Sequence, residues 1–274
     1  MEQLFEIEEY KIFTKVEGDG PPLLLIHSYW GSQCLFDHLS EALSAQMKVI
    51  RIDLPGHGFS DSPPVDFNFE KFALILNELL FRLDIPGKIS LLGHSMGGYA
   101  ALAFAARFPE RISSLVLMHT HAKAADLKSI KLREREGRLL LHGKKDLLLQ
   151  VMIPSNFAPG NTVNMEKALT LLNLTGNQVT LVGALSSISA INHRCDSMVM
   201  LQSAHYPILI IIGKHDKVYR PKEQLDEASQ IPNAEVLMLN HSGHLGFLEE
   251  EDLVLKRLQS FFEQAHEIKN IITK

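Results

Sequence analysis

The chain has few of the residues that mark secreted, membrane-bound or nucleic-acid-binding proteins. Among its 274 residues only two are cysteines, Cys34 and Cys195. This scarcity argues against a disulfide scaffold and fits a reducing compartment. Basic residues do not dominate either, since 27 lysines and arginines face 32 aspartates and glutamates, for a net charge of −5. The balance gives no basic surface for binding nucleic acid.

Long apolar runs are missing as well. Runs such as Leu23–Ile26 and Ile208–Ile212 are far shorter than the roughly 20 residues that cross a membrane, and they suit buried strands. The first residues are acidic and lack the charged and apolar regions of a signal peptide. We therefore expect a cytoplasmic protein, a monomer or homodimer, with neither membrane nor nucleic acid as a partner.

Strand-like and helix-like segments alternate along the chain except in one long stretch. Buried strands are expected at 22–27, 47–54, 89–94, 112–119, 207–213 and 235–240, and helices at 33–45, 69–83, 96–107, 221–230 and 250–266. Such alternation predicts βαβ units and a mostly parallel sheet. Residues 121–203 have a helical pattern instead. We therefore expect an α/β core in two parts, 1–120 and 204–274, with residues 121–203 inserted as a helical cap.

Two features of the cap have competing interpretations. The charged run Lys131–Glu136 is interpreted as a solvated helix face, with charge pairs three and four residues apart. Apolar residues at helical spacing in the cap, Met152 and Phe157 among them, are either pocket-lining residues or ordinary packing.

The most informative stretch is Gly93-His94-Ser95-Met96-Gly97, which fits the pattern G-x-S-x-G. An apolar strand precedes it and a run rich in helix formers follows it. A serine on such a tight strand-to-helix turn needs glycines two positions away on each side, because larger side chains would prevent the turn from closing. Its hydroxyl then lies near the positive end of the following helix. Ser95 is the predicted nucleophile.

A serine hydroxyl needs a base to take its proton, and the base needs an acid to orient it. His244, on the loop after the last predicted strand, is the candidate base, and His241 on the same loop is its competitor. Asp216 follows the strand at 207–213 and is the candidate acid. The other position for the acid, after the strand ending at Met118, offers His119-Thr120-His121 and no carboxylate. The backbone N–H groups of Met96 and Tyr29 are the predicted oxyanion donors.

These motifs together are similar to those of a known family. His27-x-x-x-Gly31, Asp53–Asp61 in the form D-L-P-G-H-G-F-S-D, the elbow, Gly213-Lys-His-Asp216 and Gly243-His244 resemble the α/β-hydrolase superfamily, nearest its small esterase, haloperoxidase-like and enol-lactonase-like branch. The resemblance implies the α/β-hydrolase fold, with a sheet of about eight strands flanked by helices. It also implies a cofactor-free Ser-His-Asp site and a helical cap between strands six and seven.

The sequence departs from the family at Ser28, where relatives have glycine after the histidine at position 27. The aromatic pair Tyr29 and Trp30 that follows suggests either an apolar acyl or aryl pocket or a pocket that these two side chains fill. Trp30, Met152 and Phe157 are therefore the candidate pocket residues. His57 and His94 are interpreted as structural.

Serine at position 95 indicates acyl chemistry, whereas aspartate there would have indicated epoxide hydrolysis or dehalogenation. With no metal-ligand spacing and no phosphate-loop pattern, we expect no metal and no nucleotide. The sequence therefore predicts a carboxylesterase-like hydrolase of small ester or lactone substrates. Three alternatives stay open: a C–C bond hydrolase of ring-cleavage products with the same triad, acyl transfer to an acceptor other than water, and a ligand receptor without turnover.

Overall fold

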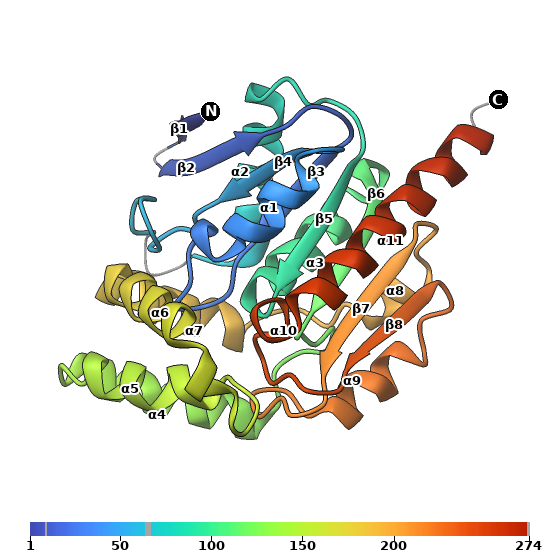
Figure 1. Ribbon diagram of the computed structural model, residues 1–274. Helices are drawn as coiled ribbons and strands as arrows, with labels where there is room; N and C mark the ends of the chain where they lie inside the picture. Colours follow the sequence, from blue (N-terminus) through green and yellow to red (C-terminus); the bar gives the residue numbers. More distant parts are fainter. Residues whose placement is uncertain (9, 64–66, 273–274) are drawn as a thin grey trace.

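An eight-stranded sheet forms the centre of the computed structural model, which describes residues 1–8, 10–63 and 67–272 (Figure 1). The strand order is β1-β2-β4-β3-β5-β6-β7-β8. β2 pairs antiparallel with β1 and β4, and the pairs from β4 to β8 are parallel. The strands are β1 (Glu2–Ile7), β2 (Tyr10–Glu17), β3 (Pro22–Ile26), β4 (Lys48–Ile52), β5 (Ile89–His94), β6 (Ile112–Met118), β7 (Ile208–Gly213) and β8 (Ala234–Leu239). The predicted mostly parallel sheet is confirmed.

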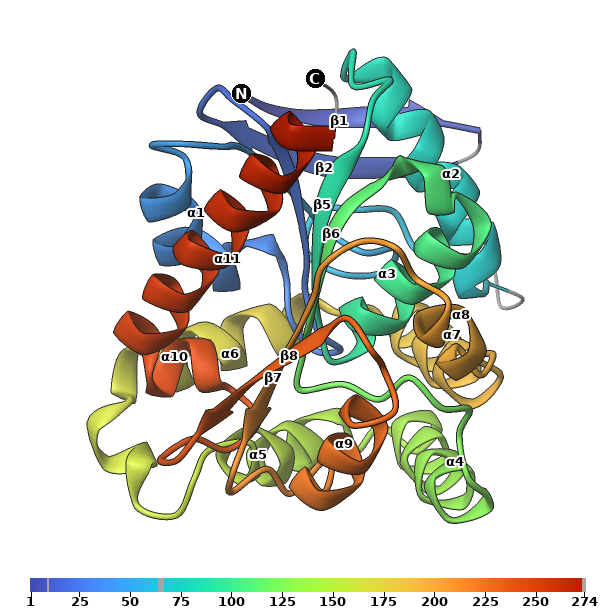
Figure 2. The ribbon, with the colours of Figure 1, turned by 90° about the vertical axis from the view of Figure 1, so that its right-hand side faces the viewer.

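Helices cover both faces of the sheet, and each strand sends alternate side chains to the two sides. In β3, Leu23 and Leu25 belong to one buried cluster while Leu24 and Ile26 belong to the other. Figure 2 shows α1 and α11 on one side of the sheet and α2 and α3 on the other. These helices, with α9 and α10 near the end of the chain, are α1 (Asp37–Leu43), α2 (Phe69–Arg82), α3 (Met96–Arg107), α9 (Pro221–Ala228), α10 (Gly246–Glu249) and α11 (Glu251–Ile272). Burial on both faces explains why the central strands are continuously apolar.

Five helices lie in sequence between β6 and β7: α4 (Leu127–Leu141), α5 (Lys145–Ser155), α6 (Glu166–Gln178), α7 (Leu181–Asn192) and α8 (Met198–Gln202). α4 to α7 lie together at one end of the sheet (Figure 1). A close backbone contact joins them to the core, where Gly183 of α7 packs against Gly56 and the Thr180 N–H donates to the Gly56 carbonyl at 3.2 Å. The division into core and cap, with boundaries near 120 and 204, stays a prediction.

Helix α4 differs from what the sequence predicts. In α4, Arg133 is partly buried and Glu136 is buried, so the interpretation of 131–136 as a solvated face is wrong for these two residues. They are three positions apart and share a face of the helix, and that face is turned inward.

Among the described residues, no helix combines the length and apolar character needed to cross a membrane.

Candidate active site

Ser95 occupies a strained turn between β5 and α3. Its backbone has φ +53° and ψ −114°, a left-handed conformation that residues other than glycine rarely adopt and that is typical of functional sites. Two hydrogen bonds tie the turn to β6 and the residues after it. The Ser95 N–H donates to the Met118 carbonyl at 2.9 Å, and the Thr120 hydroxyl donates to the Ser95 carbonyl at 2.8 Å. The neighbouring strand therefore maintains the strain.

The two glycines of the pattern are required by close backbone packing. A Cβ atom on Gly97 would collide with the carbonyl oxygen of Ile26, and one on Gly93 would collide with the carbonyl oxygen of Gly97. The start of α3 consequently lies against the carboxyl end of β3. This contact brings the N–H of Met96 next to the loop that follows β3.

His244 and Asp216 form the hydrogen bond that the sequence predicts. The two come from different loops, one after β8 and one after β7, and both side chains are almost fully buried. His244 Nδ1 and Asp216 Oδ2 are 2.9 Å apart. Because a carboxylate oxygen accepts, Nδ1 carries the proton and donates, which leaves Nε2 of His244 as the free basic nitrogen.

The competing histidine is placed differently. His241 is exposed, and its backbone N–H donates to the Glu250 carboxylate at 2.9 Å. His244 instead lies beside the elbow, where its ring centroid is 5.1 Å from that of His94 and its carbonyl accepts a 2.8 Å hydrogen bond from His94 Nε2. Among the described residues, none forms a hydrogen bond with the Ser95 hydroxyl. Such contacts are often formed only once substrate is bound.

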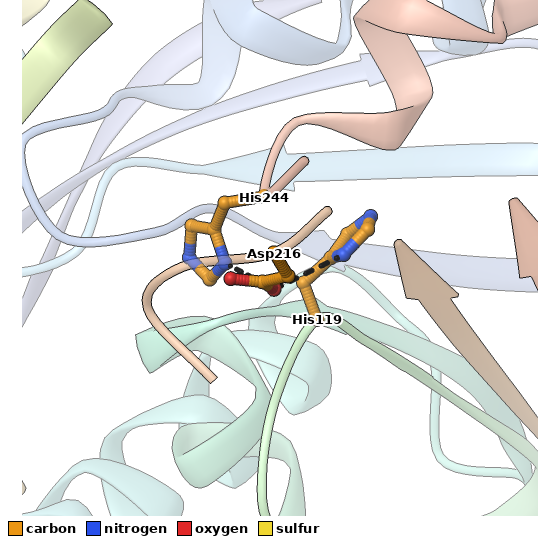
Figure 3. A group of neighbouring side chains, drawn as sticks. All are labelled: His119, Asp216 and His244. Atoms are coloured by element: carbon orange, nitrogen blue, oxygen red, sulfur yellow. Dashed lines mark hydrogen bonds and ion pairs between the residues drawn. The ribbon is translucent and has the colours of Figure 1, made fainter. Parts of the chain in front are cut away.

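A second histidine, which the sequence analysis did not assign to the site, faces the same carboxylate. His119 follows β6, is fully buried and has φ +49°. Its Nδ1 lies 3.5 Å from Asp216 Oδ2, and its Nε2 accepts the Gly246 N–H at 3.2 Å. Since Nε2 is an acceptor, the ring proton lies on Nδ1 and is directed at Asp216. Figure 3 shows the two imidazoles on either side of the Asp216 carboxylate.

The surroundings of Asp216 favour its charged form. Burial alone would raise the pKa of this carboxyl, but the charge of His244 and the hydrogen bonds from His119 and His244 lower it well below its usual range. The other carboxylate oxygen, Oδ1, accepts the N–H groups of Val218 at 2.8 Å and Tyr219 at 3.0 Å. Burial also lowers the pKa of His119, against the hydrogen bond and the charge of Asp216, which favours the neutral imidazole. An ionised acceptor therefore lies between two imidazole N–H donors.

The loop after β3 is held by His27. Its Nδ1 donates to the Ser28 carbonyl at 2.8 Å, and its Nε2 accepts the Leu54 N–H at 2.9 Å. The Gly31 N–H donates to the same Ser28 carbonyl at 3.0 Å. In a trans peptide the N–H points opposite to the carbonyl, so the N–H of Tyr29 is turned away from His27 and Gly31.

The three candidate pocket residues lie in a packed region. Trp30 and Phe157 are buried in one apolar cluster, and Met152 packs against that cluster from its edge. Asn156, next to Phe157, also contacts the base, since the His244 N–H donates to the Asn156 carbonyl at 2.6 Å. The role of Trp30, Met152 and Phe157 in binding substrate stays a prediction. A separate cavity of about 480 Å³ lies between α2, α3 and the start of α8, and its lining includes Tyr99 but none of Ser95, Asp216 or His244.

The donor atoms of His119, Asp216 and His244 lie within 4.8 Å of one another, close enough to share a metal ion. In the described structure these atoms face one another instead, as donors and acceptor of the contacts above. The expectation that the site uses no metal stays a prediction.

Comparison with known proteins gives a consistent result. Residues 21–146 match the family described as the alpha/beta hydrolase fold, and this segment contains β3, the elbow and β6. A thermophilic esterase from Thermogutta terrifontis superposes with a TM-score of 0.89 at 26% identity over 94% of both chains. The chain has the α/β-hydrolase fold.

Further proteins are similar to the chain over most of its length. The enol-lactonase of Burkholderia xenovorans LB400 shares the fold with a TM-score of 0.88 at 22% identity, covering 95% of this chain and all of that one. Lipase 3 of a Moraxella species is 28% identical and covers 88% of this chain and 80% of the lipase. The acetyltransferase component of an acetoin cleaving system from Pseudomonas putida is 30% identical over 89% of this chain and 64% of that protein.

Proposed function

We propose that the protein is a serine hydrolase of carboxylic esters or lactones. The observation that carries the proposal is the hydrogen bond between His244 and Asp216, formed next to the strained turn that presents Ser95. A positioned base and a nucleophile on a strand-to-helix elbow are the components that acyl transfer requires. The relatives point the same way, since they include an esterase, a lipase and an enol-lactonase.

In the proposed reaction, His244 Nε2 takes the proton of the Ser95 hydroxyl as Oγ attacks the substrate carbonyl carbon. The oxyanion of the tetrahedral intermediate accepts hydrogen bonds from the N–H groups of Met96 and Tyr29. When the intermediate collapses, the C–O bond breaks and His244 gives its proton to the departing alkoxide. Water then attacks the acyl-enzyme, assisted by the same base, and releases the carboxylic acid and Ser95. With a lactone the departing hydroxyl stays attached to the acyl chain.

The role of Asp216 follows from its contacts. By accepting the proton-bearing Nδ1 of His244, it fixes the tautomer that keeps Nε2 free, and its charge stabilises the imidazolium formed during attack. The low pKa of Asp216 maintains that charge.

The decisive test is covalent labelling with a fluorophosphonate probe, followed by intact mass. We expect one adduct on the parent protein and on His241→Ala, none on Ser95→Ala, and strongly slowed labelling of His244→Ala. The matched pair of histidine variants separates the proposed base from its neighbour on the same loop. Equal labelling of Ser95→Ala, or slow labelling of His241→Ala alone, would contradict the assignment. A panel of short esters and lactones then distinguishes hydrolysis from binding without turnover.

A further inference from the structure

A hydrogen bond between two tyrosine hydroxyls joins the loop that carries Asp216 to the helix that begins after Ser95. Tyr99 lies one turn into α3, and Tyr219 follows Asp216 by three positions. The Tyr99 hydroxyl donates to the Tyr219 hydroxyl. We call these two residues the tyrosine pair. The pair connects two elements that are far apart in the sequence and that hold two of the three candidate catalytic residues.

The two members of the tyrosine pair differ in exposure. Tyr99 is buried, with an exposed fraction of 3%, whereas Tyr219 is half-buried. Burial and the neighbouring Tyr219 raise the pKa of Tyr99 well above its usual range, so its hydroxyl keeps its proton. A buried hydroxyl without a partner destabilises a protein. Tyr99 is therefore a donor that needs an acceptor, and Tyr219 supplies it.

The ring of Tyr99 is itself held in place. The guanidinium carbon of Arg194 lies 4.3 Å from the ring centroid, a distance suited to a cation–π interaction. Arg194 is anchored in turn, because its Nε donates to the Lys123 carbonyl at 3.0 Å and its Nη1 to the Ile191 carbonyl at 2.8 Å. Tyr99 is therefore a fixed point to which the loop of Asp216 is attached.

Tyr219 contacts both the acid and the base. Its backbone N–H donates to Asp216 Oδ1 at 3.0 Å, and its ring centroid lies 5.6 Å from that of His244. The His121 ring lies 4.8 Å from the Tyr219 ring, and His121 Nδ1 donates to the Glu227 carboxylate at 3.0 Å. A displacement of the Tyr219 side chain would therefore also displace the backbone N–H that holds Asp216.

The position of the acid matters because catalytic side chains must be held within about 0.5 Å of their productive geometry. The N–H groups of Val218 and Tyr219 that reach Asp216 Oδ1 belong to the same loop as Asp216 and move with it. The tyrosine pair instead attaches that loop to α3, and therefore to the helix that begins directly after Ser95.

We propose that Tyr99 and Tyr219 are positioning residues for the acid of the triad. The bond between their hydroxyls fixes the loop 216–219 relative to α3, so that the Asp216 carboxylate holds His244 where it can take the proton of Ser95. The inference rests on the proposed function and adds two residues to the site. Neither tyrosine takes part in a chemical step, and both act through Asp216.

The test is a kinetic double-mutant cycle on a simple ester such as p-nitrophenyl acetate, with uncatalysed hydrolysis subtracted. Tyr99→Phe deletes the donor and leaves no buried hydroxyl without a partner. We expect kcat to fall about fivefold with KM within about twofold, the effect of one lost hydrogen bond. In the Asp216→Asn background the same change should lower kcat by less than about twofold, because the residue that the pair positions is already disabled.

Two further variants make the result specific. Tyr219→Phe removes the acceptor of the same bond, so combining it with Tyr99→Phe should lower kcat no more than the more severe of the two single changes. Tyr206→Phe is the matched control. Tyr206 is also buried, its hydroxyl donates to Met200 Sδ at 3.4 Å, and it lies at the opposite end of β7 from Asp216. This variant should have the kcat of the parent.

The outcomes separate positioning from packing and from the function itself. Equal losses of kcat from Tyr99→Phe with and without Asp216→Asn would show that the pair only supports α3, and would overturn the proposal. A raised KM with kcat unchanged would place the pair in contact with substrate and would also overturn it. An active parent whose kcat is unaffected by Tyr99→Phe overturns the positioning role and retains the hydrolase. A parent that neither hydrolyses the ester nor reacts with the fluorophosphonate probe contradicts the proposed function and the positioning role together.

Discussion

Polar groups have different surroundings on the two sides of the candidate site. On the core side, both carboxylate oxygens of Asp216 are approached by donors, and His244 is held at its Nδ1 and its backbone N–H. On the α4 side, where this helix meets the loop after β3, the contacts are looser: Arg133 Nη1 and Glu136 Oε2 are 3.7 Å apart, and the side chains of Tyr29 and Trp30 face the same carboxylate and act to lower its pKa. Both sides are buried, so exposure to solvent does not explain the difference.

The contrast separates two tasks. Core residues that transfer protons must be oriented before any substrate arrives, because reorganisation during the reaction raises the barrier. The side chains on the α4 side instead pack a helix against the loop after β3. The core side is thus arranged for proton transfer, whereas the α4 side holds the helical segment in place. Four variants or conditions test this division.

Asp216→Asn should break the core side with the largest effect. The amide preserves size, but it removes the charge and can present an N–H to His244, which favours the wrong tautomer. We expect kcat to fall about 1000- to 10,000-fold with little change in stability. Steady-state kinetics on a simple ester measure this, and Asp226→Asn on the exposed face of α9 is the control. A loss below tenfold would mean that Asp216 does not orient the base.

Lower pH should destabilise the core side, which contains histidines that are neutral when folded. Burial lowers the pKa of His27 to about 3 and that of His57 to about 4, from an ordinary 6.5. Below pH 6.5 the unfolded chain binds protons that the folded chain does not, so the free energy of unfolding falls as pH decreases. At pH 5 each histidine costs about 2 kcal/mol. Asp53 has the opposite effect on the free energy of unfolding, because burial raises its pKa to about 6. At pH 5 its contribution is about 1 kcal/mol.

Urea unfolding at pH 7.5 and pH 5 measures the effect, with an expected net loss of at least about 3 kcal/mol, because burial also lowers the pKa of His94 and His119. His57→Gln should make the pH dependence shallower, whereas His142→Gln, exposed at the end of α4, should not. An unfolding free energy that is equal at the two pH values would show that these rings are charged in the folded protein.

Much of the core side was predictable because adjacent strands of a parallel sheet deliver their loops to one end. Ser95, Asp216 and His244 each follow a predicted strand, so their proximity follows from strand order. From the sequence, His119 is only a residue at a position that lacks a carboxylate. The signal available was the same one that located Asp216, namely a titratable residue directly after a central strand.

The α4 side was not predictable in the same way. Charges three and four residues apart occur on solvated helices and on buried faces alike, so Lys131–Glu136 gave no sign that Arg133 and Glu136 point inward. That orientation depends on how α4 packs, which is set by distant residues such as Leu185 and Ile188 of α7, the neighbours of Gly137.

Two glycine variants sharpen the comparison by moving the helical segment without altering the core site. An alanine Cβ at position 183 would lie 2.5 Å from the Gly56 carbonyl oxygen, whereas at position 137 its nearest neighbour is 3.6 Å away. We expect Gly183→Ala to lower the unfolding free energy by about 1–3 kcal/mol through overpacking. Gly137→Ala should raise it by up to about 1 kcal/mol through helix propensity.

Denaturant unfolding tests this pair, and kinetics add a second readout. Because Gly183→Ala displaces α7 and its neighbours, KM should rise while kcat changes little. A large fall in kcat with KM unchanged would show that the helical segment contributes to the chemistry itself.

His119 tests the core side most finely, because it acts on the reaction only through Asp216. His119→Leu removes the N–H that faces Oδ2 and leaves the Gly246 N–H without its acceptor. We expect kcat to fall about tenfold with KM within about twofold, and the pKa of Asp216 to rise as a donor is lost. His119→Asn, which returns an N–H at this place, should recover most of kcat, and His215→Leu, exposed beside Asp216, should behave as the parent. Equal kcat for the leucine and asparagine variants would mean that His119 fills space, and that His244 alone orients the carboxylate.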